Sequence, residues 1–234
     1  MQSLKDDVIV ITGAGGSIAG AVADAFLDAG ARPALIDRDE VSIQGRAVSY
    51  SSIAVAADMT TMAGARAAIE QVRERFGHVD GLIHLVGEVT SGGVIDVRDD
   101  DQYAEAFDSN VRTLVNTVAA VLPDFLERNR GFVGGVASLE AWHGGTAGSA
   151  LFGAAKSAVA SYLKSLDEEL AGTGVGVGIC YPMGIVDTAS NRRALGRDHD
   201  GTMIDPKIIG RAFVTAATWG RGGRLVELPI YPPR

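Results

Sequence analysis

A run of small residues near the start of the chain has the composition of a phosphate-binding turn. The run Thr12-Gly13-Ala14-Gly15-Gly16-Ser17-Ile18-Ala19 follows a β-rich stretch and opens a segment of helical periodicity. Glycines let the backbone turn tightly and approach a phosphate, and the free N–H groups of a helix N-terminus attract negative charge. We therefore expect this loop to bind the pyrophosphate of a dinucleotide. The alternative is a glycine-rich corner that binds nothing.

An acidic residue stands where it would reach the ribose of such a ligand. Asp37 lies about 24 residues after Gly13, at the end of an apolar run. A carboxylate at this place bonds the ribose hydroxyls and repels a 2′-phosphate, so NAD(H) is favoured over NADP(H). The neighbouring Arg38 would pair with that phosphate and is the argument for NADP(H). A helix cap or a turn residue is the other interpretation of Asp37.

Seven β-rich runs alternate with segments of helical periodicity. The predicted strands are residues 8–11, 34–36, 53–56, 81–86, 131–136, 175–180 and 225–228. Most of them are continuously apolar, as in a sheet that is covered on both faces. Repeated strand–helix–strand order favours parallel strands with right-handed crossovers. The sequence thus predicts an α/β fold in one domain over residues 1–234, a Rossmann-type doubly wound parallel sheet of about seven strands with helices on both faces.

The longest stretch without periodicity covers residues 188–206. It is polar and contains Gly196 and Gly201. A loop of this length in a compact domain is commonly a lid over a binding site, so we expect a substrate lid here. Its basic side chains would either meet an anionic substrate or form a solvated surface: Arg192, Arg193, Arg197 and His199.

A later helical segment carries the resemblance to a known family. The run Ser149-Ala150-Leu151-Phe152-Gly153-Ala154-Ala155-Lys156 resembles the Tyr-x-x-x-Lys helix of the short-chain dehydrogenases/reductases, with Phe152 in place of the tyrosine. The glycine loop is similar to the family's Thr-Gly-x-x-x-Gly-x-Gly, with Ser17 and Ala19 at two glycine positions. The resemblance covers nearly the whole chain. It implies an NAD(P)-dependent oxidoreductase that acts on a small alcohol or ketone.

The resemblance also implies a catalytic set. Asn110 matches the asparagine that holds a proton-relay water, and Ser138 matches the serine that bonds the substrate oxygen. Lys156 matches the lysine that binds the nicotinamide ribose and lowers the pKa of the tyrosine. Phe152 stands at the tyrosine position, and a benzene ring neither donates nor accepts a proton.

Further positions are implied to contact the cofactor. These are Thr12, Gly13, Gly15, Gly16, Ser17, Ile18, Asp37, Asp58, Met59, Gly87, Lys156, Pro182, Ile185 and Thr188. Asp58 would contact the adenine amino group, or alternatively cap the next helix. Gly87 ends the segment His84-Leu85-Val86-Gly87, where the family usually has Asn-Asn-Ala-Gly. We expect His84 itself to be a buried structural residue.

Other side chains are candidates to replace the missing acid. Glu140 and His143 follow Ser138. Tyr181 precedes residues 182–188, which resemble the family's Pro-Gly loop over the nicotinamide. Tyr162 is two or three helical turns from Phe152, which is too far to reach the same point. An inactive dinucleotide-binding relative that serves as a partner subunit or sensor is the second hypothesis. A lyase or dehalogenase on the same fold is the third, and it is disfavoured because it also needs a phenol.

Composition limits the remaining classes. The 234 residues are 47% hydrophobic and 21% charged, which indicates a globular protein. A net charge of -8 argues against nucleic acid and anionic membranes as partners. No apolar run approaches the roughly 18 residues of a membrane span, and residues 1–7 do not resemble a signal peptide. Cys180 is the single cysteine, and we expect it in the core of a protein from a reducing compartment such as the cytoplasm.

We expect no metal site and a small-molecule substrate. The segments 110–128 and 156–170 carry more apolar residues than one sheet contact needs. In the family the equivalent helices pair across a twofold axis, so the resemblance implies a homotetramer, with a dimer as the alternative.

Overall fold

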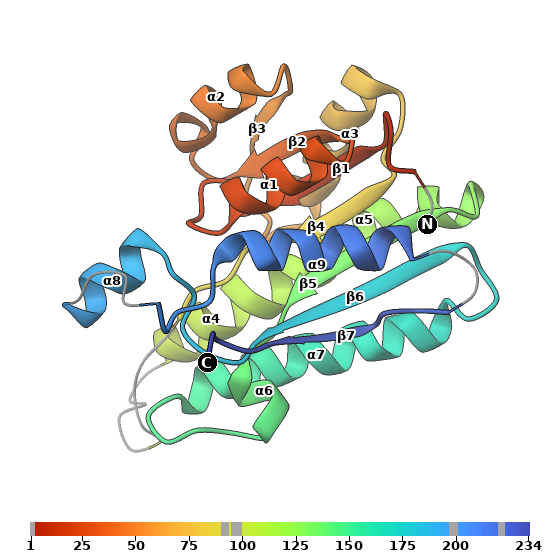
Figure 1. Cartoon of the computed structure of the whole chain (residues 1–234). Coiled ribbons are helices and arrows are strands. Elements are labelled where there is room, and N and C mark those ends of the chain that lie inside the picture. Colours follow the sequence, from red (N-terminus) through yellow and green to blue (C-terminus); the bar gives the residue numbers. More distant parts are fainter. Residues whose placement is uncertain (1–2, 90–93, 95–99, 197–200, 220–222) are drawn as a thin grey trace.

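The computed structural model describes residues 3–89, 94, 100–196, 201–219 and 223–234. Within this part of the chain, seven strands form one sheet in the order β3-β2-β1-β4-β5-β6-β7 (Figure 1). The strands are β1 (Val8–Thr12), β2 (Arg32–Asp37), β3 (Ala54–Ala56), β4 (Gly81–His84), β5 (Gly131–Val136), β6 (Val175–Pro182) and β7 (Glu227–Ile230). All six neighbouring pairs are parallel. The predicted doubly wound parallel sheet is confirmed.

Helices cover both faces of this sheet (Figure 1). Residues of α1 (Ala19–Asp28), α2 (Glu40–Ser49) and α9 (Pro206–Thr218) form one core with the strands. Residues of α3 (Met62–Phe76), α5 (Thr113–Glu127) and α7 (Ala150–Glu169) form the other. Three shorter helices, α4 (Asp100–Phe107), α6 (Leu139–His143) and α8 (Ala189–Leu195), follow the ends of β4, β5 and β6. The elements that follow the strands are thus gathered at one end of the sheet.

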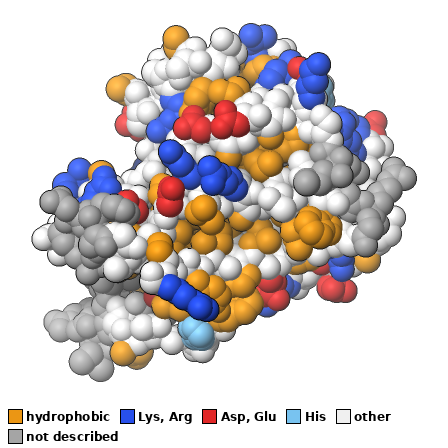
Figure 2. Space-filling view, viewed as in Figure 1, with side chains coloured by type: hydrophobic (Ala, Val, Ile, Leu, Met, Phe, Trp, Pro, Cys, Tyr) orange, Lys and Arg blue, Asp and Glu red, His pale blue; other side chains and the backbone are white. Residues whose placement is uncertain are grey.

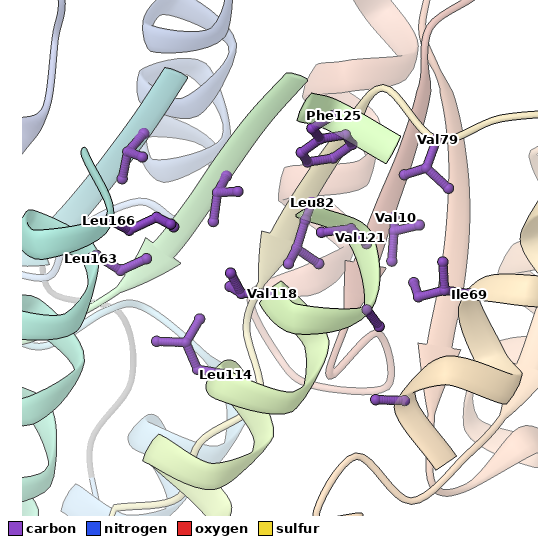
Figure 3. Close-up of a cluster of buried hydrophobic side chains, with 14 of the residues drawn as sticks. Val10, Ile69, Val79, Leu82, Leu114, Val118, Val121, Phe125, Leu163 and Leu166 are labelled. Atoms are coloured by element: carbon purple, nitrogen blue, oxygen red, sulfur yellow. The ribbon is translucent and has the colours of Figure 1, made fainter. Parts of the chain in front are cut away.

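The sheet core is built from continuous apolar strands. All five residues of β1 are buried, because helices pack on both of its faces. Figure 3 shows part of the second core, where side chains from β1, β4, α3, α5 and α7 meet: Val10, Leu82, Ile69, Leu114, Val118, Val121, Phe125, Leu163 and Leu166. Burying a side chain of this size stabilises the fold by about 1.5–3 kcal/mol. This packing fixes α5 and α7 against the strands whose ends carry the polar residues.

The strand order reverses direction between β1 and β4. From β1 the chain builds outward to β2 and β3, and from β4 it builds the opposite way to β7. Thr12 at the end of β1 is in register with His84 at the end of β4. The connections leave the sheet in opposite directions here, and ligands of such sheets bind in the resulting crevice.

The structure corrects three details of the sequence prediction. The last strand was expected at 225–228 and lies at Glu227–Ile230, and β4 ends at His84, two residues early. The stretch 188–206 was expected to be irregular, but it contains α8. The Thr188 hydroxyl caps that helix by accepting from Asn191 N at 3.1 Å, and Gly196 ends it with a φ of +62°. No helix among the described residues is long and apolar enough to cross a membrane.

Helix α9 approaches α1 through a glycine. A Cβ built at Gly210 would lie 2.7 Å from Ala21 O and 2.8 Å from Ala25 Cβ, both of which belong to α1. Gly45, inside α2, has nothing within 4 Å of the same position. The two helical glycines therefore differ in the space around them.

We predict that Gly210→Ala lowers the free energy of unfolding by about 1–3 kcal/mol, because the added methyl overpacks the α1–α9 contact. Gly45→Ala should raise it by about 0.5–1 kcal/mol, since alanine favours the helix and meets no obstacle. Urea denaturation followed by circular dichroism measures both. Equal effects from the two substitutions would contradict the close α1–α9 contact.

Candidate active site

A cavity of ≈ 430 Å³ opens at the end of the sheet where the strand order reverses. Its walls come from the segments that follow β4, β5 and β6, together with α7 and α8. Most of the lining is apolar, including Leu85, Val89, Leu139, Phe152, Ile185 and Leu195. The polar side chains that line it are Glu88, Ser138, Glu140, Lys156 and Asn191. The cavity is therefore an apolar pocket with a few polar groups, as is common for small-molecule sites.

The glycine loop lies at the edge of this cavity. Gly13 has a φ of +66°, and a Cβ there would lie 2.8 Å from Val86 N. Only glycine fits both conditions. Ile18, which lines the cavity, precedes α1, and no side chain caps the N-terminus of that helix. Ala19 N donates to Gly16 O at 3.3 Å, and the N–H groups that follow it in the first turn of α1 are left for solvent or a ligand.

Asp37 is joined to this loop. Its Oδ2 accepts a hydrogen bond from Gly15 N at 2.9 Å, and its Oδ1 accepts one from Asp39 N at 3.2 Å. The cap of α2 is Asp39, so Asp37 is not a helix cap. Arg38 forms an ion pair with Glu88, in which Nη2 of Arg38 lies 3.1 Å from Oε1 of Glu88.

Asp58 follows β3 in a turn. It accepts hydrogen bonds from the backbone N (2.9 Å) and the hydroxyl (2.7 Å) of Thr60, and these bonds lower its pKa. The cap of α3 is Thr61, so the alternative role of Asp58 as that cap is wrong. The next residue, Met59, accepts a hydrogen bond at its backbone O from Nδ2 of Asn116 at 3.0 Å.

His84 links three elements inside the protein. Its Nδ1 lies 2.8 Å from Oγ1 of Thr12 in β1, and its Nε2 lies 3.2 Å from Oγ1 of Thr113 in α5. Burial, and to a lesser extent the charge of Lys156, lowers the pKa of His84 to about 3. The ring is neutral at physiological pH, and the expected buried position is confirmed.

Lys156 is the buried cation of the site. Its Nζ donates a hydrogen bond to the backbone O of Val136, at the end of β5, over 3.0 Å. It also lies 5.8 Å from the ring centroid of Phe152, one helical turn earlier in α7. Burial lowers the pKa of Lys156 to about 8, while the negative charge of Glu140 acts in the opposite direction. The ammonium group thus lies against a carbonyl and near an aromatic ring, and it senses the charge of Glu140.

Asn110 lies in a π-helical turn, Asp108–Arg112, that leads into α5. Such turns are rare and are frequent at functional sites. The amide Nδ2 donates to Ala106 O at 2.9 Å and to Glu88 O at 3.1 Å. The amide Oδ1 is buried and has no hydrogen-bond partner among the described residues. A buried acceptor of this kind calls for a ligand or water.

Gly87 lies close to both Asn110 and Lys156. A Cβ at this position would lie 2.5 Å from Oδ1 of Asn110 and 2.9 Å from Nζ of Lys156. Any side chain would therefore displace both groups. A residue without a side chain leaves both groups in place.

Ser138 follows β5 and is buried at the edge of the cavity. Its Oγ accepts a hydrogen bond from Ala141 N at 3.4 Å, which caps the short helix α6. Its hydroxyl hydrogen stays available to a carbonyl oxygen in the cavity. Phe152 is also buried and lines the same cavity.

Of the four side chains considered as substitutes for the missing acid, Glu140 lines the cavity. His143, Tyr162 and Tyr181 do not line it. Tyr181 is buried against Trp142, with its hydroxyl donating to Glu227 at 3.0 Å, and both burial and this bond raise its pKa.

Helix α8 reaches the glycine loop. Oγ of Ser190 lies 3.2 Å from Oγ of Ser17 and 3.0 Å from Oγ1 of Thr188. Arg192 pairs with Asp187 at 2.7 Å. Neither Arg192 nor Arg193 lines the cavity.

Arg197 and His199 lie outside the described residues. The cavity residues Asn191, Ala194 and Leu195 of α8 were missed from the sequence, because nothing in their types marks them.

Comparison with known proteins agrees with this geometry. The profile of the family described as short chain dehydrogenase matches residues 7–198. An uncharacterized oxidoreductase of Staphylococcus aureus strain MW2 is 31% identical over 235 residues, covering 99% of this chain and 100% of that protein. An uncharacterized oxidoreductase of Staphylococcus saprophyticus is 31% identical over 244 residues, covering the same shares of the two chains.

Two solved structures share the fold over almost all of the chain. A 3-ketoacyl-(acyl-carrier-protein) reductase from Brucella melitensis, complexed with NADH, has a TM-score of 0.84 at 25% identity. That match covers 97% of this chain and 98% of the reductase. An actinorhodin polyketide ketoreductase variant with NADPH has a TM-score of 0.85 at 22% identity, covering 99% and 98%. The chain belongs to the short-chain dehydrogenase family of oxidoreductases.

Proposed function

We propose that this chain is a nicotinamide-dinucleotide-dependent oxidoreductase that interconverts a small ketone and its alcohol, with Phe152 at the position of the family's catalytic tyrosine. The observation that carries the proposal is the convergence of Ser138, Lys156 and Phe152 on one apolar cavity beside the glycine loop. The orphaned Oδ1 of Asn110 borders the same space. The relatives' names support an oxidoreductase, and the NADH and NADPH complexes of the two similar structures support the cofactor class.

The groups around the crevice fit a dinucleotide. Its pyrophosphate would lie against the loop formed by Thr12, Gly13, Gly15, Gly16, Ser17 and Ile18, where the uncapped N-terminus of α1 attracts negative charge. Asp37 would bond the adenosine ribose, and Asp58 and Met59 would border the adenine. The nicotinamide end would be held by Gly87, Lys156, Pro182, Ile185 and Thr188. The predicted lid, residues 188–206, of which 197–200 lie outside the described residues, would cover it with α8.

The protein's own residues then have distinct tasks. When bound, the dinucleotide supplies or accepts the hydride. The Ser138 hydroxyl orients the substrate oxygen by donating a hydrogen bond. The apolar lining excludes water from the reacting carbonyl. Lys156 holds positive charge beside that oxygen, and Phe152 contributes shape but no proton.

A second role is a dinucleotide-binding subunit or sensor with little turnover. Phe152 is the observation that favours it, because a positioned general acid contributes about 10²- to 10⁴-fold in rate. A lyase or dehalogenase remains disfavoured for the same reason. The lining carries two carboxylates, Glu88 and Glu140, and the described arginines of α8 do not line it, which favours a neutral substrate over an anionic one.

We predict that the chain binds NADH more tightly than NADPH, by about tenfold or more, because Asp37 repels a 2′-phosphate and Arg38 is paired with Glu88. Isothermal titration calorimetry with both cofactors measures this. Asp37→Ser should reduce the difference in affinity between NADH and NADPH, whereas Arg38→Ala should leave the affinity for NADH unchanged. Tighter binding of NADPH to the native chain would show that the preference is wrong, and binding of neither would remove the dinucleotide from the proposal.

We predict that Phe152→Tyr accelerates ketone reduction by about tenfold or more, in line with the contribution of a general acid. Lys156 is already placed beside the ring, and its positive charge would stabilise the phenolate. Steady-state reduction of a panel of neutral ketones measures the effect. Phe152→Leu, which adds no acid, is the matched control and should not accelerate the reaction. Fast turnover by the native chain without gain in the tyrosine variant would contradict the assignment of position 152.

We also propose that the chain forms a homo-oligomer, with a tetramer expected and a dimer as the alternative. Figure 2 shows hydrophobic side chains gathered on the face that carries α9 and β7. Ile208 of α9, Trp219 just after α9 and Tyr231 just after β7 are exposed. In α5 and α7, which the sequence had suggested, Leu126 is the one exposed large hydrophobic residue among those described. Apolar surface therefore supports an interface on α9 and β7 more than on those two helices.

Light scattering at micromolar concentration should give more than one chain per particle. Ile208→Glu should shift the native chain toward the monomer, because it places a charge in the apolar patch. Val41→Glu is the control, since Val41 is 86% exposed on α2. A monomeric native chain would contradict the proposed homo-oligomer. Equal effects of the two variants on the oligomeric state would contradict an interface on α9 and β7.

A further inference from the structure

We infer that in this chain the ammonium group of Lys156 itself gives the proton to the substrate oxygen, in the role that a phenol would otherwise take. The inference rests on the proposed function and adds a catalytic residue to it. It concerns a group that this structure places in the cavity, beside a side chain that has no proton to give.

The position of Lys156 allows direct contact with a substrate. Its Nζ makes one hydrogen bond, to Val136 O, among the described residues. An ammonium group has three N–H donors, so two remain for other acceptors. Lys156 and Ser138 line the same cavity. The proposal requires one carbonyl oxygen in that cavity to accept from the serine hydroxyl and from the ammonium group. Because position 152 carries no phenol, Lys156 is the titratable residue of α7 that lines the cavity.

The other charged groups of the cavity are not suited to give this proton. Glu88 is an acceptor in its ion pair with Arg38. Glu140 acts on Lys156 as a negative charge, which keeps the proton on the lysine. Among the described lining residues, Lys156 is therefore the proton donor that the cavity offers.

In the proposed reduction, a ketone substrate would take a hydride from the reduced nicotinamide at its carbonyl carbon, while the electron pair of the C=O π bond moves onto oxygen. One N–H bond of Lys156 then breaks, its electron pair stays on nitrogen, and an O–H bond forms on the substrate. The neutral lysine regains a proton from water, and the alcohol leaves.

The surroundings set the pH range of this step. Burial lowers the pKa of Lys156 to about 8, so the group can give up a proton near neutral pH, unlike an ordinary lysine. His84 of β4 is kept neutral by burial, and the charge of Lys156 is the smaller cause. Of the remaining described titratable groups on α4, α6 and the π-helical turn, which pack against α7, Asp108 and Arg112 pair with each other, and Asp101, Glu105 and His143 are exposed. Reduction should therefore be present below about pH 8 and be lost as the pH rises through that value.

The test combines a direct titration with kinetics. The ε-carbon signals of ¹³C-labelled lysines give the pKa of Lys156 in the native protein without dinucleotide, with Lys156→Arg used for assignment. We expect a value near 8, matching the midpoint of the reduction rate against pH. Lys156→Arg keeps the positive charge but its guanidinium does not give up a proton, so reduction should fall by about tenfold or more at saturating NADH. Lys164→Arg, on the exposed side of the same helix, is the matched control and should change neither the titration of Lys156 nor the reduction rate.

Different results would contradict the proton-donor role of Lys156 and the proposed function. A Lys156 titration near that of an ordinary lysine, a rate that does not follow the lysine titration, or full activity in Lys156→Arg would each overturn the proton-donor role. If the arginine variant does not fold, the titration and pH profile of the native chain still decide. Dinucleotide binding without ketone reduction at any pH would overturn the lysine role and leave a binding protein. Failure to bind either dinucleotide would overturn the proposed function itself.

Discussion

The buried ammonium group of Lys156 constrains everything around it. A charge removed from water is costly unless acceptors and opposite charge surround it. Here the carbonyl of Val136 accepts one N–H, and the carboxylate of Glu140 contributes negative charge. The nearby histidine is held neutral, so it adds no second cation. The position at Gly87 has no side chain, so the ammonium group stays open to a ligand.

These contacts depend on how the sheet is assembled. Val136 ends β5, Gly87 follows β4, and Lys156 projects from α7, so three separate elements must be in register to build one site. The hydrogen bonds of His84 to Thr12 and Thr113 tie β1, β4 and α5 at the same level. Packing of α5 and α7 in the core shown in Figure 3 holds their polar ends at the cavity. The site is thus as rigid as the sheet from which it is built.

The aromatic ring at position 152 alters what this arrangement does. A phenol here would take a proton from or give one to the substrate while the lysine stayed charged. With Phe152, the ring contributes an apolar wall and a face over which the cation lies. The lowered pKa of Lys156 follows from burial, and burial does not depend on a hydroxyl at that ring. The chain therefore keeps a buried ammonium group in the cavity beside a ring that has no hydroxyl.

Local patterns in the sequence determined most of the framework. Mostly continuous apolar runs predicted seven strands, because strands covered on both faces need no polar alternation, and the last of them lies two residues later than predicted. The glycine loop and the buried His84 were predicted from their neighbours in sequence. Helix α8 was not, although Thr188 and Gly196 carry its capping signals, because the segment between them is short and polar. The approach of Gly87 to Asn110 and Lys156 and the pairing of Arg38 with Glu88 were decided only by the tertiary structure, as were the cavity residues of α8. These contacts join residues from different strands and helices, and their distances depend on the packing of the sheet rather than on any spacing along the chain.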